Sequence, residues 1–297
     1  MTMYRVKNLL KNLVPMFDSF QLIKNSHEMR LFDVTLRDGL QGYKEIFTID
    51  EKKELLIKLI DNYSVQSMEI GSIVSDKVVP QMKDSIKLYN FATTINDTID
   101  FYLLVPNENA CKTALRNQVK NMSFITSVSN SFQEKNIQLS LQNTKDSLFN
   151  MNSMLQKYYT KNQNIKTKLY ISCIDHCPID GKQNLYYIVR EILFYIQYFD
   201  YDTICLSDTC GNLEFESFQY IIEKLKNENV DLSKISLHLH EQENKKNLYK
   251  IINYAMQNNI VHLDISCIND IGGCNVTLKN MKSNITFQTI YDSFTLG

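Results

Sequence analysis

Three separated segments of the sequence carry side chains that could share one chemical task. The stretch FDVTLRDGLQ spans Phe32 to Gln41, a His-Leu-His occupies residues 238–240, and a Gly-Gly-Cys occupies residues 272–274. Histidines at positions i and i+2 point to the same side of an extended segment, and Asp38 adds a hard oxygen ligand. One carboxylate and two imidazoles that converge make a site for a divalent cation.

Two neighbouring side chains add charge and a proton to this site. Arg37 places a fixed positive charge next to Asp38, and Cys274 supplies a thiol that can carry a proton. A preorganised cation stabilises negative charge as it develops, and a positioned acid can then protonate the product. The set is therefore suited to stabilising and protonating an enolate.

Each of these residues, and the further candidate Asp208, also has an interpretation that involves no chemistry. Arg37 and Asp38 could form an ion pair at the rim of the fold, and the two histidines could be one buried and one exposed. Cys274 could be a small buried residue, because free cysteine prefers the interior. Asp208, which precedes Thr209, could simply cap a turn.

The elements that must position these residues follow from the pattern of apolar side chains. Short β-branched runs predict eight strands, at residues 31–36, 67–72, 99–105, 122–128, 167–173, 202–207, 235–239 and 261–267. Amphipathic patterns predict helices between them, at residues 50–63, 183–199, 214–228 and 243–258, with a short eighth helix at 286–294. Eight strands that each precede a helix indicate an α/β protein, a (β/α)8 TIM barrel in a single domain.

Such a barrel would bring the candidate residues together. Active sites of these barrels lie at the C-terminal ends of the strands. The predicted strands or their ends hold Arg37 and Asp38 (first), Glu69 (second), Tyr170 (fifth), Asp208 (sixth), His238 and His240 (seventh) and Cys274 (after the eighth). Residues scattered over the chain are therefore predicted to meet at one mouth.

Composition narrows the class of protein. The 297 residues suffice for one large domain, and a formal net charge of -1 with 22% charged residues argues against a nucleic-acid-binding surface. The seven cysteines form no regular framework, which indicates reduced thiols in a cytoplasmic protein. No apolar run reaches the length of a membrane span.

The start of the chain allows more than one interpretation. Residues 1–15 are basic and somewhat amphipathic, which leaves a mitochondrial-targeting alternative open. The plainer expectation is that residues 1–27 form a leader or a plug under the barrel. Residues 28–297 are then the catalytic barrel, with a shortened C-terminal region.

Two runs make the sequence resemble the 3-hydroxy-3-methylglutaryl-CoA lyase family over residues 28–290. They are SIVSDKVVPQM, Ser72 to Met82, and ISCIDHCPIDGK, Ile171 to Lys182. The Thr-x-Arg-Asp-Gly-x-Gln element alone is similar to a wider group of metal-dependent barrel lyases and condensing enzymes, which includes isopropylmalate and homocitrate synthases and ketoacid aldolases. The two runs narrow the resemblance to the lyases.

The resemblance implies a metal-dependent cleavage. It implies a divalent metal held by Asp38, His238, His240 and Asn284. Nitrogen and oxygen ligands suit Mg²⁺ or Mn²⁺. The implied substrate is an acyl-CoA thioester like 3-hydroxy-3-methylglutaryl-CoA, which retro-Claisen chemistry would cleave to acetyl-CoA and acetoacetate. A homodimer and a place in leucine catabolism and ketone-body formation are implied as well.

The resemblance also implies roles for residues around the metal. Asp208, either directly or by relay through His238, would take the hydroxyl proton of the substrate. Arg37 would neutralise the thioester oxygen, and Cys274, on a mobile glycine loop, would protonate the enolate carbon. Glu69 would orient Arg37 or support the metal ligands. The residues implied to contact substrate are Gln41, Lys44, Tyr170 and Thr209.

Departures from the family pattern fall on the loops. Glu241 follows His240 where the family has aspartate. The mobile loop reads NDIGGCNV, so Asp270 stands where the family has a third glycine and Asn275 where it has proline. Asn284 lies one residue later than the family pattern has it. These changes bear on turnover and lid closure more than on metal binding.

Two alternatives remain open. One is a related barrel enzyme, which catalyses an isopropylmalate- or homocitrate-synthase-like condensation or the aldol cleavage of a 4-hydroxy-2-ketoacid. The other is a catalytically degenerate barrel used as a binding module. Turnover of thioester and ketoacid substrates separates the enzymes from each other, and metal affinity separates them from a binding module.

Overall fold

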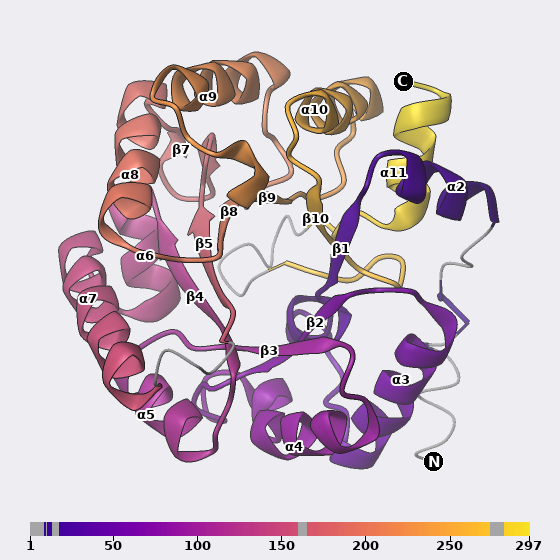
Figure 1. Ribbon diagram of the computed structural model, residues 1–297, viewed down its shortest axis with the longest axis vertical. Helices are drawn as coiled ribbons and strands as arrows, with labels where there is room; N and C mark the ends of the chain where they lie inside the picture. Colours follow the sequence, from indigo (N-terminus) through magenta and orange to yellow (C-terminus); the bar gives the residue numbers. More distant parts are fainter. Residues whose placement is uncertain (1–8, 10, 14–17, 160–164, 274–281) are drawn as a thin grey trace.

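Eight parallel strands close into a barrel that is ringed by helices (Figure 1). The structure, a computed structural model, describes residues 9, 11–13, 18–159, 165–273 and 282–297. Neighbouring strands follow the order β1-β10-β9-β8-β5-β4-β3-β2. The barrel strands are β1 (Arg30–Asp33), β2 (Ser67–Ser72), β3 (Asp100–Leu104), β4 (Asn121–Ser127), β5 (Thr167–Ser172), β8 (Thr203–Ser207), β9 (Ile235–His238) and β10 (His262–Ile265). The predicted (β/α)8 TIM barrel is confirmed.

The helices of the outer ring bury their apolar faces against the strands. In α3, the side chains of Leu55, Leu56 and Leu59 are buried, as the amphipathic pattern predicts. Thr48 and Glu51 form a capping box that begins this helix. The ring consists of α3 (Ile49–Asn62), α4 (Ser85–Ile95), α5 (Glu108–Arg116), α6 (Asn130–Ile137), α7 (Leu141–Tyr158), α8 (Leu185–Tyr198), α9 (Phe215–Asn227), α10 (Lys245–Gln257) and α11 (Phe287–Thr295). A small hairpin of β6 (His176–Cys177) and β7 (Gly181–Lys182) lies between β5 and α8.

Six strands end earlier than predicted, by one to three residues, and the endings of β1 and β9 matter for the site. β1 ends at Asp33, and the residues Thr35–Gly39 form a π-helical turn. Arg37 and Asp38 therefore lie in a turn after the strand, where the prediction had them at its end. β9 ends at His238, so His240 also lies beyond its strand.

Asp33 holds the π-helical turn to the neighbouring part of the barrel. Its carboxylate accepts hydrogen bonds from the hydroxyl of Thr35, at 2.6 Å, and from the Thr35 amide, at 3.2 Å. The Thr35 hydroxyl in turn accepts a bond from the amide of Cys267, just after β10. Full burial raises the pKa of Asp33 to about 6, although these hydrogen bonds oppose the rise.

Replacing Asp33 with asparagine should remove a pH-dependent loss of stability. Because the folded-state pKa is raised, the native protein holds the Asp33 proton more tightly than the unfolded chain. Stability is therefore lost as pH rises from the ordinary value of 3.8 to about 6. Across that window the stability of the wild type should fall relative to Asp33→Asn by roughly 3 kcal/mol.

Urea unfolding of both proteins at several pH values measures this difference. A second pair, with the exposed Asp50 changed to asparagine, controls for the general effect of removing one carboxylate. A flat difference for Asp33→Asn would show that Asp33 titrates normally in the folded state.

The described part of the N-terminal segment lies on the flank of the barrel. Helix α2 (Asp18–Ser26) packs against α11, and the ring centroids of Phe20 and Phe287 are 5.5 Å apart (Figure 1). Leu13 forms an isolated antiparallel bridge with Ile268, in the segment after β10. These described residues lie on the flank of the barrel, and the division into a leader or plug (residues 1–27) and a catalytic barrel (residues 28–297) stays a prediction. Among the helices in the described ranges, none is long and apolar enough to cross a membrane.

Candidate active site

A cavity of about 210 Å³ opens at the C-terminal ends of the strands. Of the residues predicted from the sequence, it is lined by Arg37, Asp38, Gln41, Tyr170, Thr209, His238 and His240. Much of the remaining wall is apolar, with Leu104, Ile125 and Phe132 among its members. The predicted mouth of the barrel therefore brings these residues together.

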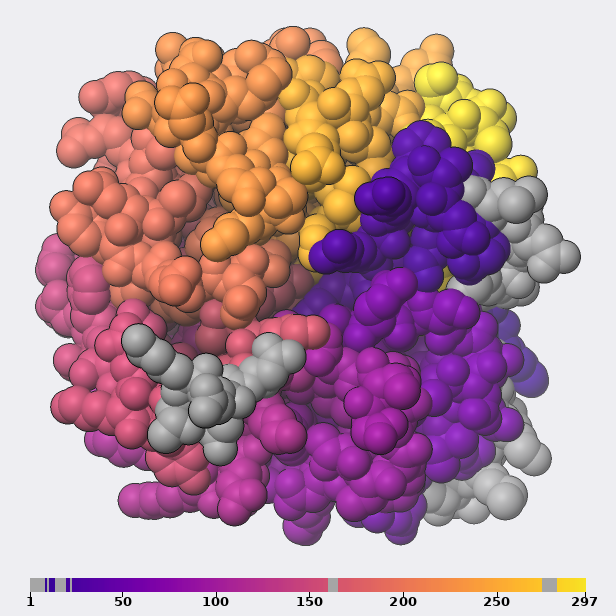
Figure 2. Space-filling view, in the orientation of Figure 1, coloured from indigo at the N-terminus to yellow at the C-terminus, as the bar shows by residue number. Residues whose placement is uncertain are grey.

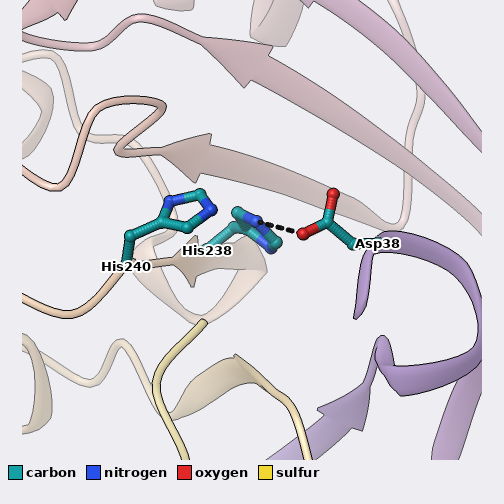
Figure 3. Close-up of side chains that lie close together, drawn as sticks. All are labelled: Asp38, His238 and His240. Carbon is teal, nitrogen blue, oxygen red and sulfur yellow. Dashed lines mark ion pairs between the residues drawn. The ribbon is translucent and has the colours of Figure 1, made fainter. Parts of the chain in front are cut away.

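Asp38, His238 and His240 converge on one point in this cavity (Figure 3). Each offers one ligand atom, and the three atoms lie within 4.8 Å of one another. Nε2 of His238 is 3.8 Å from Oδ2 of Asp38. Nε2 of His240 is buried and has no hydrogen-bond partner among the described residues. A buried lone pair without a partner is costly, and a bound cation would satisfy it.

Both histidines are turned so that Nε2 faces Asp38. Nδ1 of His240 lies 2.6 Å from the backbone oxygen of Asp208. A carbonyl oxygen can only accept, so this nitrogen carries the hydrogen and Nε2 of the neutral ring is free. Nδ1 of His238 lies 3.2 Å from Oδ2 of Asp264. Burial, followed by the charge of His238, lowers the pKa of His240, which favours the neutral ring that a metal requires.

Asn284 lies beside the cluster, as its predicted role as a ligand requires. Its backbone pairs with that of His240 in an isolated antiparallel bridge. The oxygen and nitrogen of its side-chain amide are buried and have no hydrogen-bond partner within the described part of the chain. A Cβ added to Gly272 would lie 2.6 Å from the amide carbon of Asn284, and Gly272 has a φ of +129°. Only glycine can therefore occupy position 272.

Asp38 is held as an anion by its neighbours. It accepts a hydrogen bond from Nη1 of Arg37 at 2.7 Å and another from the backbone amide of Gly273 at 3.1 Å. Burial alone would raise the pKa of Asp38, but the charges of Arg37 and the two histidines hold it well below its usual value. With two histidine nitrogens and an amide oxygen nearby, these donors fit the hard, octahedral Mg²⁺ or Mn²⁺ of the prediction.

Glu69 fixes the guanidinium of Arg37. It accepts a hydrogen bond from Nε of Arg37, a second from the Ser123 hydroxyl, and a third from the Tyr170 hydroxyl at 3.3 Å. The guanidinium carbon also lies 5.3 Å from the centroid of the Tyr170 ring. Of the two roles considered for Glu69, orienting Arg37 is the one that its contacts support.

Asp208 lies at the site, but its carboxylate is engaged elsewhere. It accepts hydrogen bonds from the amides of Asn212 and Leu213, at 3.0 and 3.2 Å, and from the side chain of Gln242 at 3.3 Å. Burial raises the pKa of Asp208. The relay predicted from Asp208 through His238 does not match these contacts, because the carboxylate beside His238 is Asp264. Asp208 caps a turn and orients His240 through its backbone oxygen.

The remaining predicted residues fall into three groups. Gln41 and Thr209 line the cavity, and the Thr209 hydroxyl accepts a hydrogen bond from the Cys173 amide at 2.9 Å. Lys44 is exposed and is not part of the cavity wall, so the structure does not bring it to the other candidates. Cys274 lies outside the described residues.

Sequence reasoning missed two buried charges, Lys168 and Asp264. Both lie in barrel strands, and they form an ion pair with each other. The available signal was a charged residue in the middle of a predicted strand. Lys168 is two residues from Tyr170 in the same strand, so the two share a face that points into the barrel.

The departures in the loops find local explanations. The carboxylate of Glu241 accepts hydrogen bonds from Thr289 of α11 and from Lys245 of α10, so it joins the two helices. Asp270 adopts a φ of +59°, which explains why a glycine suits this position. Aspartate is among the residues that tolerate this conformation best, so the substitution keeps the same backbone.

The model of the HMGL-like family matches residues 28–245. This chain belongs to the HMGL-like family. A Pseudomonas aeruginosa relative, named 3-hydroxy-3-isohexenylglutaryl-CoA/hydroxymethylglutaryl-CoA lyase, is 28% identical to this HMGL-like chain over 255 residues, which cover 83% of the chain and 78% of the relative. The mitochondrial hydroxymethylglutaryl-CoA lyase of Arabidopsis thaliana is 27% identical over 88% of the chain but only 53% of its own length.

Solved structures share the fold of this HMGL-like chain. An HMG-CoA lyase from Acinetobacter baumannii, in complex with coenzyme A and 3-methylmalate, superposes with a TM-score of 0.78 at 19% identity, over 90% of this chain and 83% of that one. The hydroxymethylglutaryl-CoA lyase of Pseudomonas aeruginosa gives a TM-score of 0.77 at 24% identity, over 90% and 85%. With the family match, the relatives make this chain a hydroxymethylglutaryl-CoA lyase-like carbon–carbon lyase.

Proposed function

We propose that this chain cleaves 3-hydroxy-3-methylglutaryl-CoA, or a similar 3-hydroxyacyl-CoA, by retro-Claisen chemistry that depends on Mg²⁺ or Mn²⁺. The products would be acetyl-CoA and acetoacetate. The observation that carries the proposal is the buried cluster of Asp38, His238 and His240 beside the guanidinium of Arg37, in one cavity. The family and the names of the relatives support the same chemistry.

Four residues would hold the metal, namely Asp38, His238, His240 and Asn284. When bound, the ion would supply a Lewis acid for the oxygens of the substrate. The protein prepares for it by keeping Asp38 charged and by leaving Nε2 of His240 and the amide of Asn284 without partners in the described part of the chain.

Arg37 is the residue that we assign to the charge developing on the thioester oxygen. Its guanidinium lines the cavity, and Glu69 and Asp38 hold it in place from two sides. A donor that is already oriented stabilises an enolate without reorganising during the reaction, an effect of roughly 3 kcal/mol. Tyr170, whose ring stacks against the guanidinium, helps to exclude water from it.

Proton transfer needs a base for the substrate hydroxyl, and we propose Asp208 acting directly. The hydrogen bond that it accepts from the uncharged side-chain amide of Gln242, at 3.3 Å, is the longest of the three described above, and giving it up would free Oδ2 of the carboxylate. The change Asp208→Asn would keep the shape of the turn and remove the base.

Cys274→Ser should slow turnover and spare metal binding. Cys274 follows Gly273, whose amide donates to Asp38, so one peptide unit separates it from a residue at the cavity. A hydroxyl is a much weaker acid than a thiol, so loss of the proton donor should lower kcat by roughly 10²- to 10⁴-fold. Mn²⁺ affinity should be unchanged. Cys210→Ser, which alters a partly buried thiol, is the control. An intact rate in Cys274→Ser would remove Cys274 from the mechanism.

Separate incubations with different substrates test the proposed reaction. The purified chain with Mn²⁺ receives the thioester in one assay and a 4-hydroxy-2-ketoacid in another. Acetoacetate from the thioester alone supports the lyase. Cleavage of the ketoacid alone would favour the aldolase alternative, and consumption of acetyl-CoA with a 2-ketoacid would favour a condensing enzyme. A protein without Mn²⁺ affinity, unchanged by His238→Ala, would be a binding module.

The implied homodimer and the cytoplasmic location stay predictions. Sedimentation velocity over a range of protein concentrations would measure the first, and localisation of a tagged full chain would measure the second. Neither result bears on the chemistry proposed for the cavity.

A further inference from the structure

A buried ion pair crosses the barrel interior beneath the candidate metal site. Lys168 of β5 donates to Oδ1 of Asp264 of β10, and both side chains are almost fully buried. The ammonium group also lies 3.6 Å from the ring centroid of Phe32 and 4.7 Å from that of Tyr170. Replacing a buried ion pair by apolar residues is often neutral or stabilising, so the pair is poorly explained by stability alone.

The second carboxylate oxygen of Asp264 links the ion pair to a histidine of the candidate metal site. Oδ2 lies 3.2 Å from Nδ1 of His238, and Nε2 of the same ring lies 3.8 Å from Asp38. Oδ1 of the same carboxylate accepts a hydrogen bond from Nζ of Lys168, so Asp264 takes part in the ion pair as a carboxylate. An ionised carboxylate can only accept a hydrogen bond, so Nδ1 must carry the hydrogen. In the neutral ring, Nε2 then has the lone pair that a metal needs.

The two histidines of the cluster reach the same orientation by different routes. His240 is held by a backbone oxygen, that of Asp208, which any residue at position 208 would provide. His238 is held by a side chain, so its orientation depends on the identity of residue 264. A histidine that ligates a metal usually donates its other N–H to such a partner, and losing that partner weakens metal binding.

We propose that Asp264, charged by its pairing with Lys168, is a positioning residue that fixes the ring and the tautomer of His238 for metal binding. The inference rests on the proposed metal site, but its claim about the tautomer concerns the metal-free protein. Nothing in the arrangement requires Asp264 to touch the substrate, because it lines the opposite end of the barrel.

A second ion pair at the N-terminal end of the barrel provides a control for the Lys168–Asp264 pair. Lys168 and Asp264 form part of the wall of a second cavity, of about 500 Å³, which opens at the N-terminal ends of the strands on the face seen in Figure 2. The same wall contains another ion pair, between Lys166 and Asp100, which is partly exposed. Within the described part of the chain, neither Lys166 nor Asp100 contacts His238 or His240. The second pair therefore has the same charges and lines the same cavity as the first, but it cannot orient a ligand of the metal.

The tautomer is measured first, in the metal-free full chain. Long-range ¹H–¹⁵N spectra of the histidine rings distinguish a hydrogen on Nδ1 from one on Nε2. The signal of His238 is assigned by its loss in His238→Gln. We expect the Nδ1–H form in the wild type, and a mixture of tautomers in the double variant Lys168→Met/Asp264→Leu. A wild-type ring with its hydrogen on Nε2 would overturn the proposal, whether or not the variant folds.

Metal affinity is measured second, by titration with Mn²⁺ alone. The variant Lys168→Met/Asp264→Leu should bind Mn²⁺ about 10- to 100-fold more weakly than the wild type. The variant Lys168→Met/Asp264→Asn keeps an acceptor at position 264 and should recover part of the affinity. The control Lys166→Met/Asp100→Leu should bind like the wild type.

The outcomes separate this inference from the proposed function. If the wild type does not bind Mn²⁺, the proposed function fails, while the spectra still decide whether Asp264 sets the tautomer. If the wild type binds Mn²⁺ and Lys168→Met/Asp264→Leu binds it equally well, the positioning role fails while the metal site stands. A loss of affinity in the Lys166 and Asp100 control as large as in the test variant would likewise overturn it.

Discussion

His240→Ala should abolish Mn²⁺ binding and catalysis while leaving the fold intact. Removing a group that only supports a ligand weakens metal binding by about 10- to 100-fold. Removing a ligand itself should therefore lower the affinity for Mn²⁺ by more than roughly 100-fold. The effect on stability should be small, because the ring makes one hydrogen bond, to the Asp208 oxygen, and its Nε2 is already without a partner among the described residues. That bond contributes about 1 kcal/mol.

Calorimetric titration with Mn²⁺ and thermal unfolding measure the two effects on the same samples. His27→Ala, which removes an exposed ring that packs on Phe294 of α11, is the control and should leave the Mn²⁺ affinity unchanged. If His240→Ala binds Mn²⁺ as tightly as the wild type, the ligand set derived from the cavity is incorrect. Loss of the fold instead would mean that the ring contributes more to packing than its contacts indicate.

Arg37→Lys should lower kcat by about 100-fold or more at nearly unchanged Mn²⁺ affinity. Arginine reaches Glu69 through Nε and Asp38 through Nη1 at once, and a lysine ammonium cannot reproduce this fork. The remaining charge would be misplaced relative to the thioester oxygen, and losing one such donor typically costs 10²- to 10³-fold in kcat. Single-turnover assays of product formation report this step directly.

A double-mutant cycle separates the chemistry of Arg37 from its packing. Arg37→Met leaves the fully buried Glu69 without its charged partner, which should cost roughly 3 to 5 kcal/mol of stability. Adding Glu69→Gln should restore most of the stability and none of the activity. Recovery of kcat in the double variant would show that Arg37 acts only by neutralising Glu69.

The periodicity of the sequence predicted the barrel well because the regular alternation of strands and helices is the main requirement of a closed parallel barrel. The exceptions have local causes. β1 stops at Asp33, where the side chain turns back to bind Thr35, a short-range interaction that the apolar pattern does not encode. Two helices, α6 and α7, lie between β4 and β5, and Gln138, which follows α6, adopts a φ of +60°. No glycine marks that break.

Some features of the site could likewise be predicted from local sequence, and others depend on contacts between distant strands. The spacing of His238 and His240 was enough to place both on one side of the chain, and the pairing of His240 with Asn284 keeps that orientation beyond the end of β9. Lys168 and Asp264 are 96 residues apart, and only barrel closure brings them together. The second contact of Asp264, to His238, is likewise invisible until the strands are in register. The relay from Asp208 to His238 was inferred from the family resemblance, whereas the carboxylate that contacts His238 in the structure belongs to Asp264.

The backbone at Gly272 and Gly273 touches two of the four predicted ligands at once. Gly273 donates to Asp38, and Gly272 leaves no room for a side chain against Asn284. Binding of an ion and the backbone conformation at Gly272 and Gly273 are therefore energetically linked, and linkage of this kind is reciprocal. Consider a thioester whose binding depends on the conformation of this backbone. If a bound ion raises the affinity for the thioester by some factor, the bound thioester must raise the affinity for the ion by the same factor. Ion titrations made without and with a saturating, unreactive thioester should therefore differ by the same factor as thioester titrations made without and with the ion.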